Sequence, residues 1–545
     1  MQNAHPERSE RELAEMIGIP RGTLRHWQQR QGDIDADPEV VAFFTSPSGV
    51  AFLHRLVLAA HFVISFLGPC GVRLVCTFLE LSGLAQFVAA SYGAQRGVSV
   101  ALEQEMAAYE KEEEGRLGAA MSGKQIVVAQ DETFHERPCL VAIEPVSGYI
   151  LVEAYAANRQ AETWTAAMEK GMTDKPIEVV QSTRDEGRGI CSHVTKGLGA
   201  HHAPDVFHVQ QEVSRATSGP LASKVRQAET EVAAAEKEVA RQEAAQAKFT
   251  RGKRRRGRRS RFDKRISAVR QAAQAARSRL AERQRQQERA RLARRSISQV
   301  YHPYQLEIGA AQDAAAAATA LAAQFERLEA VAQEAGLSER SQQRIAKAKR
   351  VVPQMVATIA FFWLTVRAKI DALQLAPAVE KSVYDNLLPA FYLYTVAGKA
   401  KIASRRKELE QRADALLAPL LHKDSLLQQL AVAEIQLLED VAWECVHLFQ
   451  PASSCVEGRN GQLALRHHAL HRLSDRKLNA LKVVHNFYLQ REDGTTAAER
   501  FFDAPPRDLF AYLLERVDIP GFPAQKRPHV VQKISLVSPE NDGLD

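Results

Sequence analysis

Three carboxylates, far apart in the sequence, are candidates for one metal-dependent site. Asp131 lies near the end of an expected strand, Asp185 lies at the end of another, and Glu457 lies in the first turn of an expected helix. Carboxylate oxygens suit Mg²⁺, which keeps several waters and accepts phosphate oxygens as further ligands. Two such ions can stabilise both the entering and the leaving oxygen when a phosphodiester is cut. The residue types therefore predict phosphodiester chemistry, if the fold brings the three acids together.

The identity of the ligands is open at two of these positions. Glu132 follows Asp131 and Glu186 follows Asp185, so either neighbour could be the true ligand. Asp205 is a rival for the second acid. We prefer Asp185, because it ends a strand that would lie next to the strand of Asp131 in the fold that this part of the sequence predicts.

The segment 124–213 has the alternating pattern of an α/β core. A strand over 124–134 and a hairpin around the turn Pro145–Gly148 come first. An amphipathic helix, a strand ending at Asp185, a second helix and a fifth strand over 203–213 follow. The order βββαβαβ, an antiparallel meander followed by alternating helices and strands, is the RNase H-like pattern with a mixed sheet. Such a core would bring the three acids together.

A large helical insertion, 214–449, interrupts this core. Apolar residues repeat at spacings of 3 and 4 over 225–239 and over 266–280, which predicts an antiparallel coiled-coil hairpin. In its tip, 251–261, eight of eleven residues are Lys or Arg and none is acidic. Cations that neutralise phosphates release counterions, so we expect the tip to contact DNA, although charge runs are usually solvated loops or localisation signals. The DNA contacts expected there are Arg254, Arg255, Arg256, Arg258 and Arg259.

Residues 9–30 have the pattern of a helix-turn-helix. Ser9 and Glu12 are spaced as a capping box at the start of a helix. Gly18 and Pro20 would end that helix. An ordinary helical hairpin is the alternative interpretation. The candidates for contacts in a DNA groove, on the second helix, are Arg21, Thr23, Arg25 and His26.

The composition is that of a soluble globular protein. Of 545 residues, 45% are apolar and 25% are charged, which excludes disorder throughout and a small disulfide-stapled fold. The net charge is +7, and six cysteines occur without a CxxC pair, as expected for reduced intracellular thiols. The first residues lack the apolar core of a signal peptide, and the apolar run 56–68 is shorter than the about 20 residues that span a bilayer. We expect a cytoplasmic protein without a membrane segment, associated with the nucleoid when it binds DNA.

These stretches together resemble bacterial insertion-sequence transposases of the DDE, RNase H-like superfamily. The stretch QDETF resembles the strand that carries the first Asp in that family, and STRDEGRGI resembles the segment that carries the second Asp. The stretch SSCVEGRNGQLALRHH resembles the helix that carries the family's Glu. Asp205-Val-Phe-His208 is similar to the C/DxxH motif of hAT and Mutator-like transposases. Those families also place a large helical insertion before the Glu helix, as 214–449 would be.

The resemblance implies a DNA transposase. Asp131, Asp185 and Glu457 would bind two Mg²⁺ ions, for which Mn²⁺ can substitute, and activate water to nick the ends of a transposon. The freed 3′-OH would then attack target DNA without a covalent protein intermediate. Asp205 and His208 would support the site. The implied partner is double-stranded DNA, both the terminal repeats and the target, held by at least a homodimer.

The helix that carries the third acid contains further candidates. We expect Arg459, Asn460 and Arg466 to contact DNA. His467 and His471 have the i, i+4 spacing that suits a metal on a helix. Their basic neighbours make a DNA-facing helix the better interpretation.

Other histidines, and two tryptophans, have two interpretations each. His201, His202 and His208 could ligate zinc, although a surface loop with one structural histidine is the simpler interpretation. The resemblance to hAT transposases implies an aromatic residue that stacks on a flipped base. Trp363 and Trp443 are the candidates, although the apolar stretch around Trp363 is typical of a core.

The sequence thus predicts an α/β RNase H-like core interrupted by an all-α insertion and preceded by helical segments. A catalytically inactive, domesticated DNA-binding or regulatory protein, or an interaction scaffold around the coiled coil, are the alternatives. The predicted segments are a helix-turn-helix (1–35), a helical domain (36–122), the first part of the core (123–213), the insertion (214–449), the second part of the core with the Glu helix (450–503) and a C-terminal tail (504–545).

Overall fold

The chain divides into two compact units, which are mostly helical. Unit 1 consists of Met1–Leu117 and Leu463–Asp545, and unit 2 consists of Gly118–Gln462. The predicted second part of the core, 450–503, is therefore divided between the units. The computed structural model describes residues 9–16, 20–22, 24–25, 34–184, 187–252 and 260–523.

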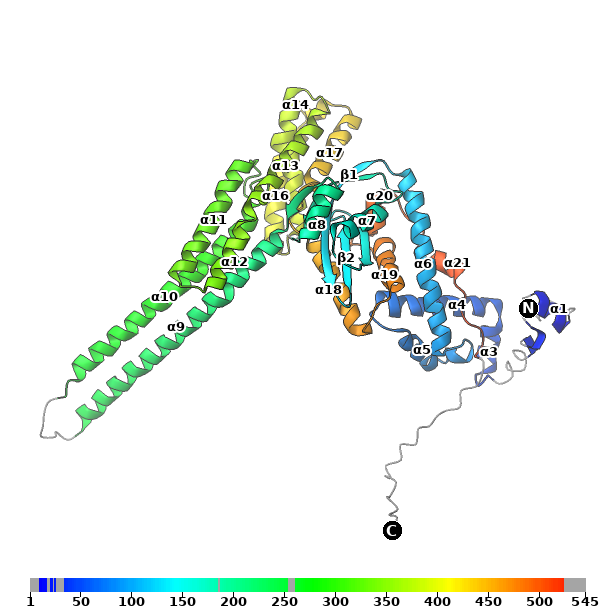
Figure 1. The fold of residues 1–545 in the computed structure, drawn as a ribbon, viewed down its shortest axis with the longest axis horizontal. Helices are drawn as coiled ribbons and strands as arrows, with labels where there is room; N and C mark the ends of the chain where they lie inside the picture. Colours follow the sequence, from blue (N-terminus) through cyan, green and yellow to red (C-terminus); the bar gives the residue numbers. More distant parts are fainter. Residues whose placement is uncertain are drawn as a thin grey trace, which may run out of the picture. The chain divides into compact units, whose positions relative to one another are not determined.

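One mixed sheet lies in unit 2 (Figure 1), with the strand order β3-β2-β1-β4-β5. β1 (Lys124–Phe134), β2 (Pro138–Ile143) and β3 (Ile150–Tyr155) pair as an antiparallel meander. β4 (Ile177–Arg184) pairs parallel with β1, and β5 (His201–Pro204) pairs parallel with β4. The central strand is therefore β1. This is the mixed α/β arrangement that the sequence pattern predicted.

The fifth strand is shorter than predicted. β5 ends at Pro204, and the residues from Val206 onward belong to helix α9. The predicted strand over 203–213 is wrong because Asp205 caps the helix: its carboxylate accepts a hydrogen bond from the Phe207 amide at 2.7 Å. Val209 and Val213, which resemble alternating strand residues, are four residues apart on the buried side of α9.

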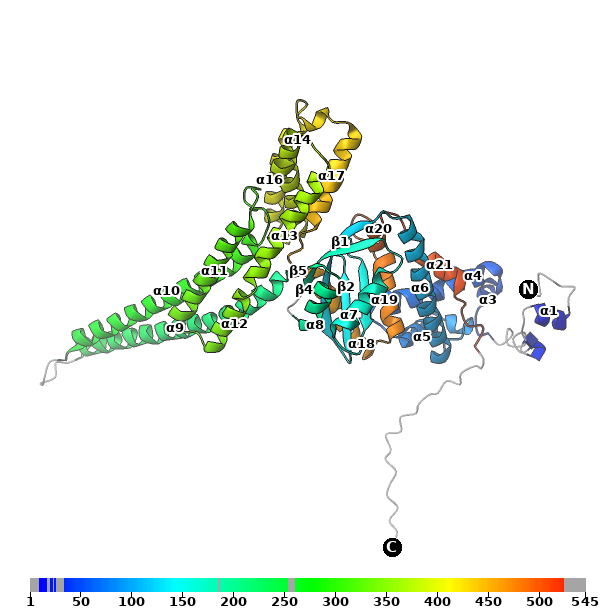
Figure 2. The same ribbon diagram turned by 45° about the horizontal axis from the view of Figure 1, so that its top comes forward.

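Helices α7 (Ala161–Met172) and α8 (Arg188–Ser192) lie in front of the strands in Figure 2. The π-helical turn η4 (His193–Gly197) follows α8 and contacts both α7 and β5. Trp164 and Met168, one turn apart on α7, are fully buried. They are the apolar stripe that the amphipathic pattern of this segment predicted.

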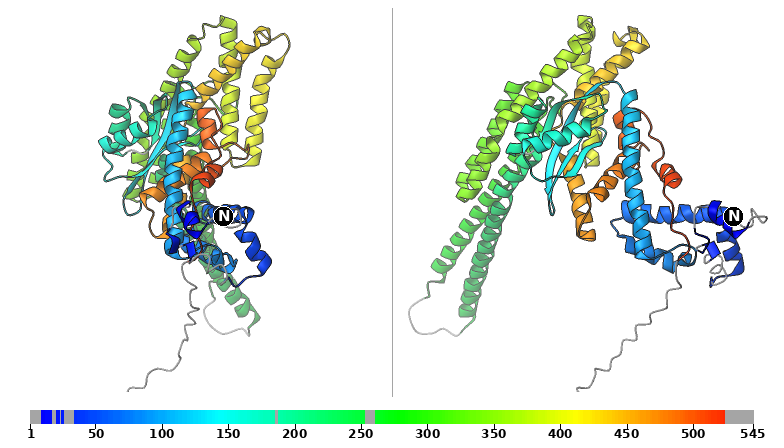
Figure 3. Two further views of the ribbon diagram at one scale, coloured as in Figure 1. Left: turned by 90° about the vertical axis from the view of Figure 1, so that its right-hand side faces the viewer. Right: turned by 45° about the vertical axis from the view of Figure 1, so that its right-hand side comes forward.

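The insertion begins with the predicted helical hairpin. α9 (Val206–Arg251) and α10 (Phe262–Val300) run side by side in every view (Figures 1 and 3). The buried residues of α10 include the small Ala273 and Ala276 and the branched Ile266. Ion pairs join the two helices, among them Arg277 with Glu236 at 2.6 Å. Residues 253–259, most of the basic tip, lie outside the described residues.

The rest of the insertion is a helical cluster with an aromatic core. Tyr304, Phe362 and Tyr392 are buried in it. Trp363 Nε1 donates a hydrogen bond to the Gln312 carbonyl, and Trp443 stacks on Phe391. Both tryptophans therefore pack against the core. The helices are α11 (Ala314–Glu334), α12 (Glu339–Lys349), α13 (Val352–Asp371), α14 (Pro377–Ser382), η5 (Val383–Leu387), α15 (Leu388–Lys399), α16 (Ala403–Leu421), η6 (Leu427–Gln429) and α17 (Val432–His447).

Unit 1 is helical, with a core that includes Leu53, Val57, Val75 and Leu79. The next helix along the chain after the insertion, α18 (Ser454–Leu470), crosses from unit 2 into unit 1. The other helices of unit 1 are α1 (Glu10–Met16), α3 (Pro38–Thr45), α4 (Pro47–His61), η2 (Phe62–Leu67), α5 (Val72–Leu81), η3 (Leu84–Gln86), α6 (Tyr92–Ala120, which continues to unit 2), α19 (Asp475–Phe487), α20 (Ala497–Phe502) and α21 (Leu509–Arg516).

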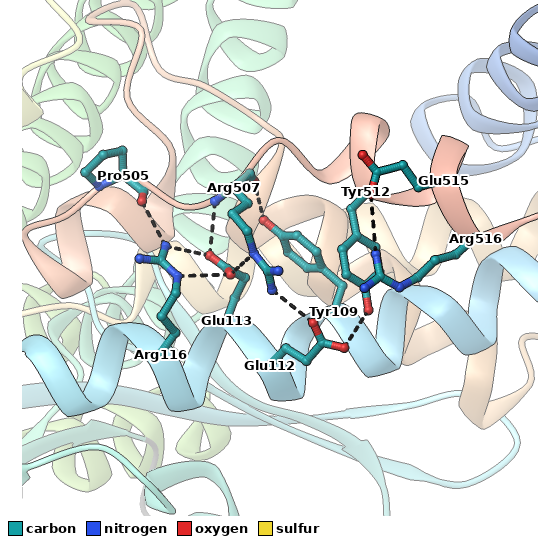
Figure 4. A network of polar contacts seen from close by, with 9 residues as sticks. All are labelled: Tyr109, Glu112, Glu113, Arg116, Pro505, Arg507, Tyr512, Glu515 and Arg516. Carbon is teal, nitrogen blue, oxygen red and sulfur yellow. Dashed lines mark hydrogen bonds and ion pairs between the residues drawn. The ribbon is translucent and has the colours of Figure 1, made fainter.

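The beginning of the C-terminal tail is folded onto α6 (Figure 4). The Arg507 guanidinium pairs with Glu112 at 3.0 Å and also with Glu113. Tyr512 donates a hydrogen bond to Glu112 at 2.9 Å, and Tyr109 donates one to the Arg507 carbonyl. Burial raises the pKa of Tyr109, so this hydroxyl stays a donor. The segment after α20 is thus part of unit 1.

Two helical segments, Pro47–Leu67 and Glu339–Asp371, are long and apolar enough to cross a membrane by length and composition. This is weak evidence, because core helices of soluble proteins pass the same test. Leu53 and Val57 of the first, and Phe362 and Val366 of the second, are buried in the cores of their units. The observation is compatible with a soluble protein.

Candidate active site

The alternation of β1 separates Asp131 from its neighbour Glu132. Successive side chains of a strand point to opposite faces of the sheet. Glu132 accepts a hydrogen bond from Trp164 Nε1 of α7 at 2.9 Å and pairs with Arg159 at 3.1 Å. Its carboxylate is therefore engaged on the α7 face, and Asp131 belongs to the opposite face.

On that opposite face, Asp131 meets helix α18. Asn460 Nδ2 donates a hydrogen bond to Asp131 Oδ2 at 2.9 Å, although the two residues are 329 positions apart in the sequence. Glu457 precedes Asn460 by three residues, and residues at this spacing share a helix face. The structure therefore brings the helix of Glu457 against the strand of Asp131.

A buried ion pair anchors the same helix to β3. Arg459 Nη2 lies 2.7 Å from Glu153 Oε1, and Arg459 Nε lies 2.5 Å from Glu153 Oε2. The two side chains are 5% and 0% exposed. Because the guanidinium is buried and neutralised in this way, the predicted contact of Arg459 with DNA is wrong for this structure. Its position gives it the role of fixing α18 on the sheet.

The DxxH element joins the start of α9 to the start of α18. Asp205 is buried, and its carboxylate accepts hydrogen bonds from the Phe207 amide and from the Ser453 hydroxyl. His208 Nε2 lies 3.8 Å from Asp205 Oδ2 and 3.8 Å from Glu457 Oε1. Asp205 thus has both oxygens engaged, whereas the half-exposed Glu457 carboxylate faces His208.

The second predicted acid, Asp185, and its neighbour Glu186 lie outside the described residues. The residue before them, Arg184, is described, and its carbonyl accepts a hydrogen bond from the Asp205 amide at 3.2 Å. Thr183 donates a hydrogen bond to the Gln450 carbonyl, in the segment that leads into α18. β4 therefore ends beside both the DxxH element and the entry to the Glu457 helix.

A neutral histidine supports the sheet from the α7 face. His193 stacks on Trp164, and its ring nitrogens contact Thr165 at 2.9 Å and Gln130 at 3.2 Å. Burial, with a smaller contribution from the charge of Arg184, lowers the pKa of His193 to about 4. Gln130 is thereby fixed between the histidine and the Ser182 hydroxyl of the neighbouring strand β4.

The oxygens on the α18 face fit a hard divalent cation. Asp131 and Glu457 offer carboxylates, and Asn460 Oδ1 is buried without a hydrogen-bond partner among the described residues. Carboxylate and amide oxygens are ligands that Mg²⁺ accepts. Within the described part of the chain, no three His, Cys, Asp or Glu side chains form a metal-binding group. Asp185 is not among the described residues.

Two further predictions for the α18 helix are changed by the structure. Arg466 donates hydrogen bonds to the carbonyls of Phe66 at 2.6 Å and Gly68 at 3.0 Å, so its guanidinium caps the end of η2. His471 lies beyond the last residue of α18 with φ of 60°. His467 and His471 therefore do not form a helical i, i+4 pair, and that metal interpretation is wrong.

The remaining candidates lie in β5, near α1 or outside the described residues. Arg21 and Arg25 are exposed and lie 3.5 Å and 3.4 Å from Glu10. His201 and His202 belong to β5 and not to a surface loop, and His201 stacks on Phe361. Burial lowers the pKa of His201 to about 4. Thr23, His26, Arg254, Arg255, Arg256, Arg258 and Arg259 lie outside the described residues.

Sequence reasoning missed Glu153 as a partner in this region. The only sequence signal for Glu153 is that its carboxylate occurs in an otherwise apolar strand, ILVEAY. Ser453 is a second such partner, since its hydroxyl donates a hydrogen bond to Asp205.

One comparison with known proteins gives a match. Residues 383–529 match a family model described as a family of unknown function, DUF6399. The matched segment contains α18 with Glu457 and Asn460, but not the sheet with Asp131. No curated protein and no solved structure matches this chain.

Proposed function

We propose that the chain is a DNA transposase of the DDE type, which cuts transposon ends and joins the freed 3′-OH to target DNA in a metal-dependent, RNase H-like core. The hydrogen bond between Asn460 and Asp131 carries the proposal. It joins the central strand of the sheet to the helix of Glu457 across the whole insertion. A convergence of this kind is what a shared carboxylate site requires.

The strand order supports an RNase H-like core. β1 carries Asp131 and has the antiparallel meander on one side and the parallel strands β4 and β5 on the other. The register pairs Ala129 with Thr183, and Thr183 reaches the segment that leads into α18. Thr183 therefore shares the face of Ala129 and Asp131, and Asp185 follows Thr183 by two residues in the sequence. We therefore propose Asp185 as the second acid.

The roles of the residues follow from their positions. Mg²⁺, when bound, would supply polarisation of the phosphodiester and a water that is more easily deprotonated. Asp131, Glu457 and Asp185 would hold two such ions, for which Mn²⁺ can substitute. Asn460 orients the Asp131 carboxylate through its amide nitrogen.

Asp205 and His208 act on this site as positioning residues. Asp205 fixes the start of α9 and accepts a hydrogen bond from Ser453, which precedes α18 by one residue. His208 faces Glu457 from α9. Together they set the entry of α18, and with it the orientation of Glu457.

A nicking assay tests the proposal. The substrate is DNA that flanks the gene, with its inverted repeats, in the presence of Mg²⁺ or Mn²⁺. We expect strand cleavage by the wild type, and loss of cleavage with retained DNA binding in Asp131→Asn, Asp185→Asn and Glu457→Gln. Glu408→Gln, at an exposed position of α16, is the matched control and should cleave like the wild type. Binding without any metal-dependent cleavage by the wild type would instead identify a catalytically inactive DNA-binding protein.

A further inference from the structure

A single carboxylate on helix α9 is shared by three cations. Glu212 Oε1 lies 3.6 Å from Lys347 Nζ and 4.0 Å from Arg215 Nη1. Glu212 Oε2 lies 3.9 Å from Arg344 Nε. Among the residues that the structure describes, no other carboxylate lies within 4.0 Å of these three cations. One negative charge therefore faces three positive charges from two helices, α9 and α12.

Two of these three cations are exposed, and Arg344 is partly exposed. The side chain of Lys347 is 68% exposed and that of Arg215 is 53% exposed. Arg340, one turn before Arg344 on α12, is also exposed. Exposed ion pairs contribute only about 0–1 kcal/mol, so their attraction to Glu212 leaves the cations available to a stronger anion. We call Arg215, Arg340, Arg344 and Lys347 the α9–α12 basic surface.

The α9–α12 basic surface adjoins the candidate active site. His208 and Glu212 are four residues apart on α9, so they share a face of the helix and are separated by roughly 6 Å along its axis. His208 Nε2 lies 3.8 Å from Glu457 Oε1. Glu212, whose carboxylate contacts the three cations, therefore lies about one turn along α9 from His208, the residue that faces Glu457.

We infer that the α9–α12 basic surface binds the sugar–phosphate backbone of the DNA strand that enters the active site. Naming DNA as the ligand rests on the proposed function. A site built from carboxylates repels a phosphodiester, and cations beside it offset that repulsion. Flexible Lys and Arg side chains on two helices suit backbone contacts, which position DNA without reading its sequence. Such contacts release counterions and make binding salt-dependent.

The test compares two variants that each lose two exposed positive charges. Arg215→Gln with Lys347→Gln changes the basic surface, and Lys381→Gln with Lys423→Gln changes exposed lysines at α14 and after α16. Affinity for a fluorescent DNA duplex is measured by anisotropy over a range of salt concentrations. We expect weaker binding by the first variant, with a slope of log K against log salt that is shallower by about 1.8, at about 0.9 for each neutralised phosphate. The lysine control should bind like the wild type.

Glu212→Gln gives a result of opposite sign. This substitution removes the carboxylate that the three cations share, so DNA binding should be tighter at low salt and the salt slope steeper. Arg215→Lys keeps the charge and should keep the affinity, which separates loss of charge from loss of folding. Unchanged affinity and slope in Arg215→Gln with Lys347→Gln overturn the inference, and so does weaker binding by Glu212→Gln.

The same experiments separate this inference from the proposed function. Wild-type protein that binds DNA through the basic surface but never cleaves it supports the inference and contradicts the enzyme. Cleavage that persists with an unaltered salt slope in the Arg215→Gln, Lys347→Gln variant supports the enzyme and overturns the inference. Wild-type protein that binds no DNA overturns both.

Discussion

Arg459 of α18 and Glu153 of β3 form a two-point ion pair whose side chains are 5% and 0% exposed. They are 306 residues apart in the sequence. Arg459 lies between Glu457 and Asn460, so the pair fixes the part of α18 that faces Asp131. Breaking such a pair from one side leaves an uncompensated buried charge, which is strongly destabilising.

We expect Glu153→Ala to lower the free energy of unfolding of unit 2 by about 3–5 kcal/mol. Hydrogen exchange of the β3 and α18 amides would measure the loss. Glu231→Ala, which removes a pair with Arg279 whose side chains are 44% and 58% exposed, is the control and should cost about 0–1 kcal/mol. Equal protection in the two variants would show that the buried pair does not hold α18.

Asn460→Ala should raise the Mg²⁺ concentration needed for half-maximal nicking by roughly 10-fold or more, because residues that orient a metal ligand affect metal affinity on that scale. DNA affinity should not change. Asn386→Ala removes an amide that donates to the Leu416 carbonyl within the insertion and serves as the control. A Mg²⁺ profile of Asn460→Ala that matches the control would remove Asn460 from the site.

Acid should destabilise unit 2 partly through His193. Its pKa is 6.5 in the unfolded chain and about 4 in the folded protein, so between these values only the unfolded state binds the proton. Stability therefore falls as the pH decreases from 6.5 to 4. Over this pH range, the free energy of unfolding of His193→Gln should fall by less than that of the wild type. The difference should be on the order of 1–3 kcal/mol. Denaturant unfolding at several pH values measures this, with His422→Gln, whose side chain is 72% exposed, as the control. An equal acid loss in wild type and His193→Gln would contradict the prediction.

The basic tip of the hairpin is a separate prediction from sequence. Replacing 253–259 with a Gly-Ser linker should weaken DNA binding and make the salt slope shallower by about 0.9 for each phosphate that the tip neutralises. Thermal unfolding should be unchanged, because the linker still joins α9 to α10. The prediction would be wrong if anisotropy titrations gave the same slope for both proteins.

Local patterns in the sequence predicted most of the sheet and the helical hairpin. Strands such as 124–134 have β-branched and aliphatic runs, and the 3- and 4-residue spacing over 225–239 is typical of packed helices. The fifth strand was misplaced because Val209 and Val213 fit either period. The Asp205 cap, whose hydrogen bond to Phe207 starts the helix, decides between them.

The candidate site could be predicted only in part from the sequence. Residue type and strand position pointed to Asp131 and Glu457, because each lies at a predictable place in its own element. The roles of Arg459 and Arg466 could not be predicted from the sequence, because their partners, Glu153 and the η2 carbonyls, are hundreds of residues away along the chain. A surface arginine and a buried, paired arginine can have the same pattern of neighbouring residues in the sequence.

Binding of Mn²⁺, followed by electron paramagnetic resonance, reports on metal at the proposed carboxylate site independently of DNA. We expect bound Mn²⁺ in the wild type and in Glu408→Gln. We expect an affinity weaker by roughly 10-fold or more in each of Asp131→Asn, Asp185→Asn and Glu457→Gln. Wild-type affinity in all three variants, or no bound Mn²⁺ in the wild type, would contradict a shared carboxylate site.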